Sequence, residues 1–329
     1  MRLREIEQIR ERQLSAQLTV DSETSEGALV DYRLLDESSF RRWVGRIGGE
    51  KVLRVLAARI APEILSKLSI EYDLVGVGGR FQLDSLQARA LQSLRDLNAP
   101  TVLVPGCGAC GEDFQFWLRN GIRNIIGVDF NNFRPTWNEF TPILEDRYQA
   151  NVRCFIAPME KLPLGDNSVD AVYTTATLEH VYNLEEGLRE SFRVLRPGGI
   201  AVHSIGPLFY THGGDHCISS YGLGHGYDHL LLEEEEYRKR VSDDAFYSGT
   251  PDPQSHWWAR NDQLSFLEPK QYTEIFDRVF SRRVFTGVEI STEALAFREQ
   301  FPEKWGALLE AGLTEETLLI KSLNLLCQK

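Results

Sequence analysis

The stretch TVLVPGCGACGEDFQFWLRNGIRNIIGVD, residues 101–129, decides the fold of this chain. It opens on a short apolar run, Thr101 to Val104, which predicts a buried strand. Three glycines follow, and Glu112 to Asn120 then has the apolar spacing of a helix. Asn124 to Val128 predicts a second buried strand, and Asp129 comes directly after it. Strand, glycine turn, helix, strand and terminal carboxylate together form the nucleotide-binding unit of an open α/β sheet.

The glycine turn by itself does not identify which nucleotide cofactor the chain binds. Gly106, Gly108 and Gly111 have the spacing of a dinucleotide fingerprint, with an acid about 20 residues further on. Glycines let the backbone approach a ligand closely, and the start of the helix offers free N–H groups to it. Asp129 lies where a carboxylate accepts hydrogen bonds from a ribose diol. This stretch alone leaves open a nicotinamide or flavin site, an S-adenosylmethionine site, and glycines that serve only packing.

Composition limits the classes of function that the chain can have. With 329 residues and a hydrophobic content of 42%, it can bury a sizeable core. A net charge of −12 without a basic stripe disfavours a nucleic-acid partner and an anionic membrane surface. No apolar run is long enough to span a bilayer, and the N-terminus lacks the apolar core of a signal peptide. Five cysteines without regular spacing indicate reduced thiols, so we expect a cytoplasmic protein.

The chain that follows this unit repeats the alternation of strand and helix. Strands are predicted at Asn151 to Ile156, Val169 to Thr174 and Ile200 to Ile205. An amphipathic helix, Leu184 to Leu195, lies between the last two strands and ends at Pro197-Gly198-Gly199. This alternation predicts parallel βαβ units, in which the ligand lies across the carboxyl ends of the strands.

Five segments of this region resemble a known family. They are PGCG at 105–108, GVD at 127–129, PMEKLPLGDNSVDAV at 158–172, LEHV at 178–181 and RVLRPGG at 193–199. In this order and spacing, over residues 101–205, the chain resembles the class I S-adenosylmethionine-dependent methyltransferases, in the small-molecule branch similar to methyltransferase type 11. RVLRPGG discriminates best, because a nicotinamide enzyme has no reason to carry that helix-to-strand turn at this place.

The resemblance implies an α/β fold with a Rossmann-like, mostly parallel, seven-stranded sheet and an antiparallel closing strand. Arg282 to Ile290 and Leu318 to Cys327 would then form the closing antiparallel pair, and Tyr272 to Phe280 the last helix. Residues 1–98 are too long to be a tail, and we expect them to form an N-terminal helical cap on a methyltransferase domain at 99–329.

An insertion is expected after the fifth strand. GGDH at 213–216 and HLLLEEEEY at 229–237 are similar to the insertion that the small-molecule enzymes carry there. Its glycine-rich and histidine-rich composition predicts a lid over residues 207–265. The acceptor would lie between this lid and the N-terminal cap.

The implied activity is transfer of a methyl group from S-adenosylmethionine to a small-molecule acceptor, whose attacking atom (O, N, S or C) the sequence does not identify. Asp129 would bind the ribose hydroxyls, and the glycine turn would pass under the methionine part. The cofactor-binding residues that we expect are Gly106, Gly108, Asp129, Asn131, Met159, Glu160 and Thr175.

Three positions depart from the family's usual pattern. An acidic residue that orients the methionine amino group is commonly found near Pro105, and Glu112 or Asp113 would have to substitute for it. Cys110 stands where glycine is commoner. Pro158 stands where the adenine-binding turn often has Asp, so backbone groups at Met159 and Glu160 would read the adenine edge.

Histidines supply the candidate catalytic groups. His180 follows the fourth predicted strand, beside the expected methyl position, and imidazole suits a general base near neutral pH. A role for the Glu179-His180 pair in fixing the loop is the alternative. His212 and His225 lie among glycines, where the backbone can turn a side chain into a cleft, so we expect them to face the acceptor.

No metal site is predicted. His216 and His229 are expected to be structural, and with Asp215 and Asp228 they match no common zinc spacing. Cys107-x-x-Cys110 would need two further ligands to form a zinc site, and the sequence has no second Cys-x-x-Cys pair to supply them. We therefore expect these two cysteines to be small residues that pack a tight loop.

Two other functions stay open. An NAD(P)-dependent oxidoreductase would use the same glycine turn but would leave RVLRPGG unexplained. A non-catalytic binding protein on a methyltransferase fold is suggested by Pro105 and Cys110. The sequence predicts neither the acceptor nor the oligomeric state.

Overall fold

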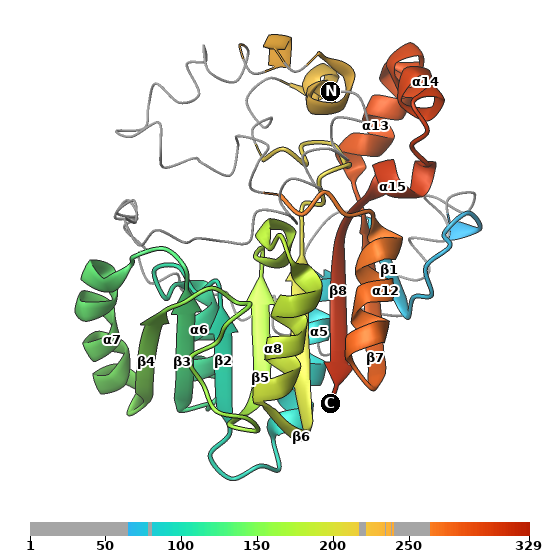
Figure 1. Cartoon of the computed structure of the whole chain (residues 1–329). Helices are drawn as coiled ribbons and strands as arrows, with labels where there is room; N and C mark the ends of the chain where they lie inside the picture. Colours follow the sequence, from blue (N-terminus) through green and yellow to red (C-terminus); the bar gives the residue numbers. More distant parts are fainter. Residues whose placement is uncertain (1–64, 78–80, 217–221, 234, 238, 240–263) are drawn as a thin grey trace.

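The computed structural model describes residues 65–77, 81–216, 222–233, 235–237, 239 and 264–329 (Figure 1). Most of the predicted N-terminal cap and the middle of the predicted lid lie outside these ranges. Within them, one sheet is flanked by helices on both faces.

The sheet has eight strands among the described residues. They are β1 (Leu74–Val77), β2 (Thr101–Pro105), β3 (Asn124–Asp129), β4 (Asn151–Ile156), β5 (Val169–Thr175), β6 (Leu195–Ile205), β7 (Arg282–Ile290) and β8 (Ile320–Gln328). Their order is β1-β7-β8-β6-β5-β2-β3-β4. β8 runs antiparallel to β6 and β7, and the other neighbours are parallel. The Rossmann-like, mostly parallel sheet and its closing antiparallel pair are therefore confirmed.

The expected number of strands was wrong by one. β1 pairs in parallel with the edge strand β7, from Leu74 opposite Gly287 to Val77 opposite Ile290. It has only four residues and glycines follow directly, so the sequence pattern does not mark it as a strand. Although β1 precedes residue 99, it belongs to the same sheet as the strands of residues 99–329, so the expected boundary at residue 99 does not separate it from them.

The helices connect these strands or follow them. They are α5 (Phe81–Leu94), α6 (Glu112–Arg119), α7 (Arg134–Tyr148), α8 (Leu184–Val194), α9 (Asp228–Leu231), α12 (Pro269–Val279), α13 (Thr292–Gln300), α14 (Pro302–Glu310) and α15 (Glu315–Leu319), with 3-10 turns η1 (Leu178–His180) and η3 (Leu223–His225). The start of α8 is fixed by the Asn183 side chain, which accepts a hydrogen bond from the Glu186 amide. The predicted helices after β2, between β5 and β6, and before β7 are all present.

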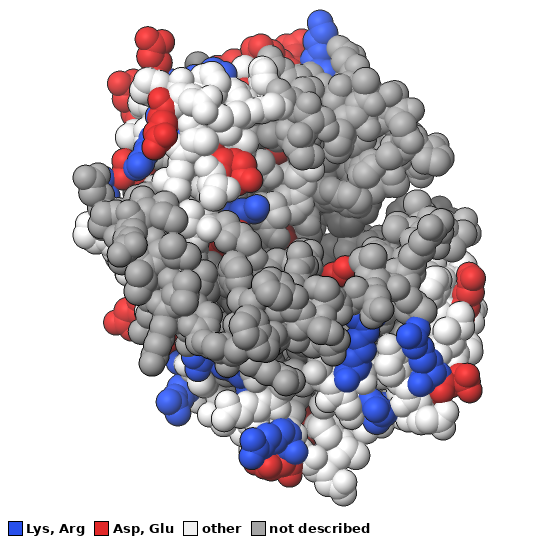
Figure 2. Space-filling view, turned by 180° about the vertical axis from the view of Figure 1, so that it is seen from behind, with Lys and Arg blue, Asp and Glu red and all other residues white. Residues whose placement is uncertain are grey.

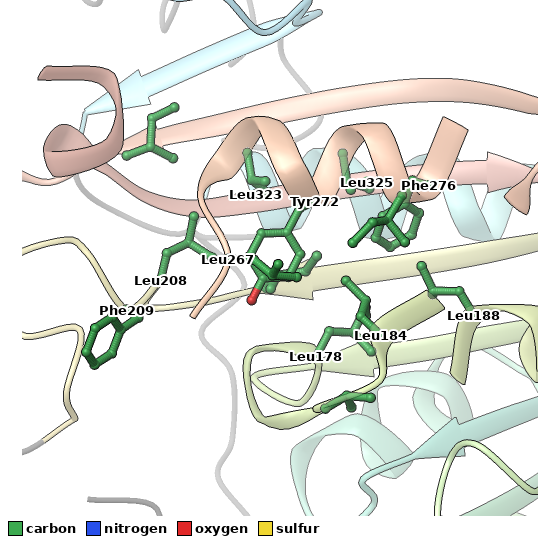
Figure 3. Close-up of a cluster of buried hydrophobic side chains, with 14 of the residues drawn as sticks. Leu178, Leu184, Leu188, Leu208, Phe209, Leu267, Tyr272, Phe276, Leu323 and Leu325 are labelled. Carbon is green, nitrogen blue, oxygen red and sulfur yellow. The ribbon is translucent and has the colours of Figure 1, made fainter. Parts of the chain in front are cut away.

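The strands send alternate side chains to two separate cores. Val102 and Val104 of β2 lie in one core with α5, α6 and α7, and Leu103 lies in the other. In that second core, Tyr272 and Phe276 of α12 pack with leucines of α8 and β8 (Figure 3). Burial of each such side chain contributes about 1.5–3 kcal/mol. The two cores hold the carboxyl ends of β2, β3 and β5 in fixed positions.

A layer of short helices lies beyond the carboxyl ends of the parallel strands (Figure 1). α13, α14 and α15 are inserted between β7 and β8, where no helices were predicted. α13 contacts η3, and α14 contacts α9, so this insertion packs against the described part of the insertion after β6.

Candidate functional site

The glycine turn after β2 is tied to the end of β3. The amides of Gly106 and Cys107 both donate to the Val128 carbonyl oxygen, at 2.7 and 3.2 Å. Gly106 has φ +68°, and a Cβ atom there would lie only 2.3 Å from Cγ2 of Thr177. Glycine is therefore required at position 106 by both conformation and space.

Asp129 links the glycine turn to the residues after β3. Its Oδ2 accepts a hydrogen bond from the Gly108 amide at 2.9 Å, and its Oδ1 accepts one from the Asn131 amide at 2.8 Å. The side chain is buried, and burial raises its pKa, although these amides oppose the rise. Each carboxylate oxygen can accept a further hydrogen bond. The carboxylate is thus held in place with acceptor capacity left for a diol.

Asp113 brings a second carboxylate to the same edge of the sheet. It lies in the first turn of α6, and Thr175 at the end of β5 donates from Oγ1 to Oδ1 and Oδ2, at 2.8 and 2.7 Å. Burial raises the pKa of Asp113 to about 6, and the Thr175 hydrogen bond opposes the rise. Of the two acids expected to substitute near Pro105, the structure joins Asp113 to Thr175.

The predicted adenine turn follows β4. The Ala157 amide donates to the Asp129 carbonyl oxygen at 2.9 Å, which ties this turn to β3. Met159 is buried against Gly187 of α8. Glu160 is half-buried, and burial raises its pKa. Phe130, directly after Asp129, is 46% exposed and was missed by the sequence analysis, although an exposed aromatic ring beside a nucleotide site can stack on a base.

Three thiols lie under the glycine turn. Cys110 Sγ lies 3.4 Å from Cys154 Sγ, and Cys107 lies beside them. A Cβ atom on Gly127 would lie 2.8 Å from the Cys107 sulfur. Burial raises the pKa of the Cys107 thiol well above its usual range. The Cys107-x-x-Cys110 pair therefore packs the base of the turn, and Cys154, from β4, is a neighbour that spacing along the chain did not reveal.

A carboxylate and two imidazoles meet just after β5. One potential ligand atom from each of Glu179, His180 and His216 lies within 4.8 Å of the other two. The His180 and His216 rings meet edge to face, with centroids 5.0 Å apart. His216 was expected to be structural, and the structure brings it next to the candidate base His180.

Glu179 is the most deeply buried member of this cluster, at 1% exposed. Its backbone carbonyl accepts a hydrogen bond from the Ser265 amide, but neither side-chain oxygen has a hydrogen-bond partner among the described residues. Burial raises the pKa of Glu179 to about 8, and the backbone amides of Glu179 and Gly206 oppose part of this rise.

His212 and His225 lie in the helical layer with partners of their own. His212 Nε2 is 2.9 Å from the Leu223 carbonyl oxygen, and its ring packs edge to face against Tyr227. His225 Nδ1 is 2.8 Å from Oδ2 of the buried Asp228. The cluster around His180 includes neither of them. Their assignment to the acceptor stays a prediction.

His229 is fully buried, and its Nε2 lies 2.8 Å from the Phe209 carbonyl oxygen. Burial lowers its pKa. These contacts are those of a residue that packs the insertion.

Charge is distributed unevenly over the face opposite to that of Figure 1. Lys and Arg side chains lie mostly in the lower half of Figure 2, and Asp and Glu side chains mostly at its upper end. Across the described part of the chain, every helix falls short of the length and apolarity that a bilayer crossing demands.

The comparison with known proteins concerns the part of the chain that builds this site. Residues 103–203, from β2 into β6, match the family described as a methyltransferase domain. Over this segment the chain is similar to the class I S-adenosylmethionine-dependent methyltransferases. The matched segment includes the glycine turn, Asp113, Asp129, the predicted adenine turn and the Glu179-His180 pair.

The relatives that this segment resembles are named for methylation of different atoms. A ubiquinone/menaquinone biosynthesis C-methyltransferase of Geotalea daltonii is 29% identical over 79 residues, 24% of this chain and 33% of that protein. A malonyl-acyl-carrier-protein O-methyltransferase of Pectobacterium atrosepticum is 30% identical over 99 residues, 30% of this chain and 36% of that protein. A human thiol S-methyltransferase is 34% identical over 125 residues, 36% of this chain and 49% of that protein. The chain thus spans between a third and a half of the length of these relatives.

Proposed function

We propose that this chain transfers a methyl group from S-adenosylmethionine to a small-molecule acceptor. The observation that carries the proposal is the carboxylate of Asp129, which the Gly108 and Asn131 amides fix at the end of β3 inside a methyltransferase domain. A carboxylate at this position is suited to bind a vicinal diol, and the cofactor's ribose has one.

The surrounding residues supply contacts for the other parts of the cofactor. Gly106 and Gly108 would pass under the methionine part, and Asn131 would lie beside the ribose. Asp113, oriented by Thr175, would bind the amino group of the methionine part, because it is a carboxylate at the expected edge. The adenine would lie at the turn of Met159 and Glu160.

The chemistry follows from the cofactor's own reactivity. S-adenosylmethionine supplies an electrophilic methyl group, so the protein's contribution is to orient the acceptor in line and to exclude water. His180 lies just after β5, where a base would take the proton from an oxygen, nitrogen or sulfur nucleophile. Curated relatives of the C-, O- and S-methyltransferase classes leave the acceptor atom open.

The wider assignments are part of the same proposal. We assign residues 99–329 to the methyltransferase domain, together with β1 and α5, which precede residue 99 but pack with its sheet. The rest of residues 1–98 is assigned to the expected cap and residues 207–265 to a lid, with the acceptor between cap and lid. A net charge of −12 and reduced thiols support a cytoplasmic protein whose partner is a small molecule rather than nucleic acid.

The test is production of S-adenosylhomocysteine from S-adenosylmethionine when the purified chain meets fractionated metabolite pools. We expect at least one fraction to give turnover, with a product heavier by one methylene group in mass spectrometry. A matched thermal-shift series with S-adenosylhomocysteine, NAD and NADP separates the alternatives. Stabilisation by a nicotinamide dinucleotide alone would favour the oxidoreductase, and no response to any of the three would favour a non-catalytic protein.

A further inference from the structure

We propose that Glu179, His180 and His216 bind a divalent transition cation, Zn²⁺ or a cation of similar preference, just after the carboxyl end of β5. Methyl transfer from S-adenosylmethionine does not by itself call for a metal, so this site is separate from the cofactor contacts. Two imidazoles and one carboxylate are a ligand set that suits zinc and iron(II).

The carboxylate of Glu179 is the strongest observation. It is 1% exposed, and although the amides of Glu179 and Gly206 lie near enough to lower its pKa, neither side-chain oxygen has a described partner with the distance and angle of a hydrogen bond. Buried polar groups are normally hydrogen-bonded, and a buried charge is normally paired or bound to a metal. A cation shared with His180 and His216 would neutralise this carboxylate and coordinate it.

One ring nitrogen of His216 has a hydrogen-bond partner in the backbone, and the other ring nitrogen can bind a metal. Its Nε2 lies 3.2 Å from the Pro207 carbonyl oxygen, so an N–H at that position donates to the backbone. The neutral ring then presents a lone pair at Nδ1. Histidines that bind metals commonly donate their second N–H to a carbonyl or carboxylate in this way, which fixes tautomer and orientation.

The spacing of the three donors fits a cation after a small adjustment. The donor atoms lie within 4.8 Å of one another. Zinc bonds of about 2.0–2.2 Å in a tetrahedron place ligand atoms about 3.3–3.6 Å apart. Side-chain rotations that move the donors by about 1 Å would close the difference. His180 follows Glu179 in the same 3-10 turn, so two of the three ligands come from one fixed segment.

Three protein ligands leave a fourth position open, as in catalytic rather than structural zinc sites. A hydroxyl or thiol bound there would lose its proton more readily, because the cation stabilises the anion. This step rests on the proposed function: the acceptor would be a small-molecule alcohol, phenol or thiol, and the proton would leave to solvent. His180 would then act as a ligand instead of a general base.

The test uses Zn²⁺ alone, added to the purified full-length chain after treatment with a chelator. Calorimetry is expected to show one site per chain. His216→Ala and His180→Ala should each weaken zinc binding at least tenfold, with folding checked by circular dichroism. Glu179→Gln is expected to do the same, and the two histidine variants keep the test decisive if Glu179→Gln does not fold.

Two controls separate this site from other zinc-binding groups. Cys154→Ser removes one of the three thiols under the glycine turn, and His225→Ala removes a histidine paired with a carboxylate elsewhere. Both should keep the zinc affinity of the parent chain. With Co²⁺ in place of Zn²⁺, the spectrum should lack the thiolate charge-transfer band that a cysteine site would give.

Absence of a site, or full affinity in both His180→Ala and His216→Ala, would overturn the proposal. Binding of S-adenosylhomocysteine is measured on the same metal-free samples. S-adenosylhomocysteine binding without zinc binding would contradict the metal site alone, and zinc binding without S-adenosylhomocysteine binding would contradict the proposed function alone.

Discussion

At the scale of single residues, two glycines with positive φ make a matched pair. Gly106 has φ +68° and no room for a Cβ atom, whereas Gly121 has φ +92° and open space around it. Gly121→Ala should cost about 1 kcal/mol of stability, because only the backbone is strained. Gly106→Ala should cost more and should also weaken S-adenosylhomocysteine binding, measured by chemical denaturation and calorimetry.

Thr177 provides the check on that explanation. It contributes the atoms that a Cβ at position 106 would meet, so Thr177→Ala should recover part of the stability lost in Gly106→Ala. Equal losses for Gly106→Ala and Gly121→Ala would show that the close contact with Thr177 is unimportant.

The raised pKa of Asp113 leads us to expect that cofactor binding depends on pH. Its folded pKa is raised to about 6, so the carboxylate that would bind the methionine amino group is lost as pH falls through 6. We therefore expect S-adenosylhomocysteine affinity to decrease between pH 7 and pH 5. Asp113→Asn should weaken binding at pH 7 and flatten this part of the profile, as calorimetry across the range would show.

The raised pKa of Asp113 affects the stability of the fold in the direction opposite to its effect on cofactor binding. A raised folded pKa means that Asp113 favours the folded state below its ordinary pKa, and this contribution is lost as pH rises through about 6. Asp113→Asn is expected to keep or raise the thermal stability at pH 7. A variant that is less stable at pH 7, with an unchanged binding profile, would contradict the assignment.

At the scale of elements, His212 joins η3 to the layer of short helices. Its Nε2 interacts with the Leu223 carbonyl, and its ring packs against Tyr227 and Phe297 of α13. We expect His212→Ala to lower the melting temperature, because it removes both the hydrogen bond and the packing. A fully stable His212→Ala variant with slow turnover would instead support the sequence-based prediction that this residue faces the acceptor.

The elements show why sequence reasoning succeeded in some places. β2, β3 and β5 are continuous apolar runs bounded by glycine, proline or charge, and the turn between β2 and α6 needs glycine at position 106 for a local reason. Such features depend on neighbours along the chain, so the nucleotide-binding unit was predictable from the sequence.

Other elements depend on contacts between distant segments. β1 is a four-residue strand that is stabilised by pairing with β7, more than 200 residues further on. The meeting of His216 with Glu179 and His180, and of Cys154 with Cys110, likewise joins separate parts of the chain. Spacing along the sequence gives no measure of such distances, so these parts of the site could not be predicted.

At the scale of the whole molecule, the fold collects the candidate groups at one edge. β2, β3 and β5 end beside one another and bring the glycine turn, Asp129 and Thr175 together, while the insertions after β6 and β7 pack as a layer beyond that edge (Figure 1). We propose that this edge binds S-adenosylmethionine through the carboxylate of Asp129.

Calorimetric titration of S-adenosylhomocysteine into the parent chain, Asp129→Ala and the exposed-surface control Asp96→Ala tests this claim most directly. Loss of hydrogen bonds to a charged group costs about 1.5–3 kcal/mol, so Asp129→Ala should bind roughly tenfold to over a hundredfold more weakly. Asp96→Ala should bind like the parent chain. Unchanged affinity in a correctly folded Asp129→Ala variant, or no binding by the parent chain, would contradict the account.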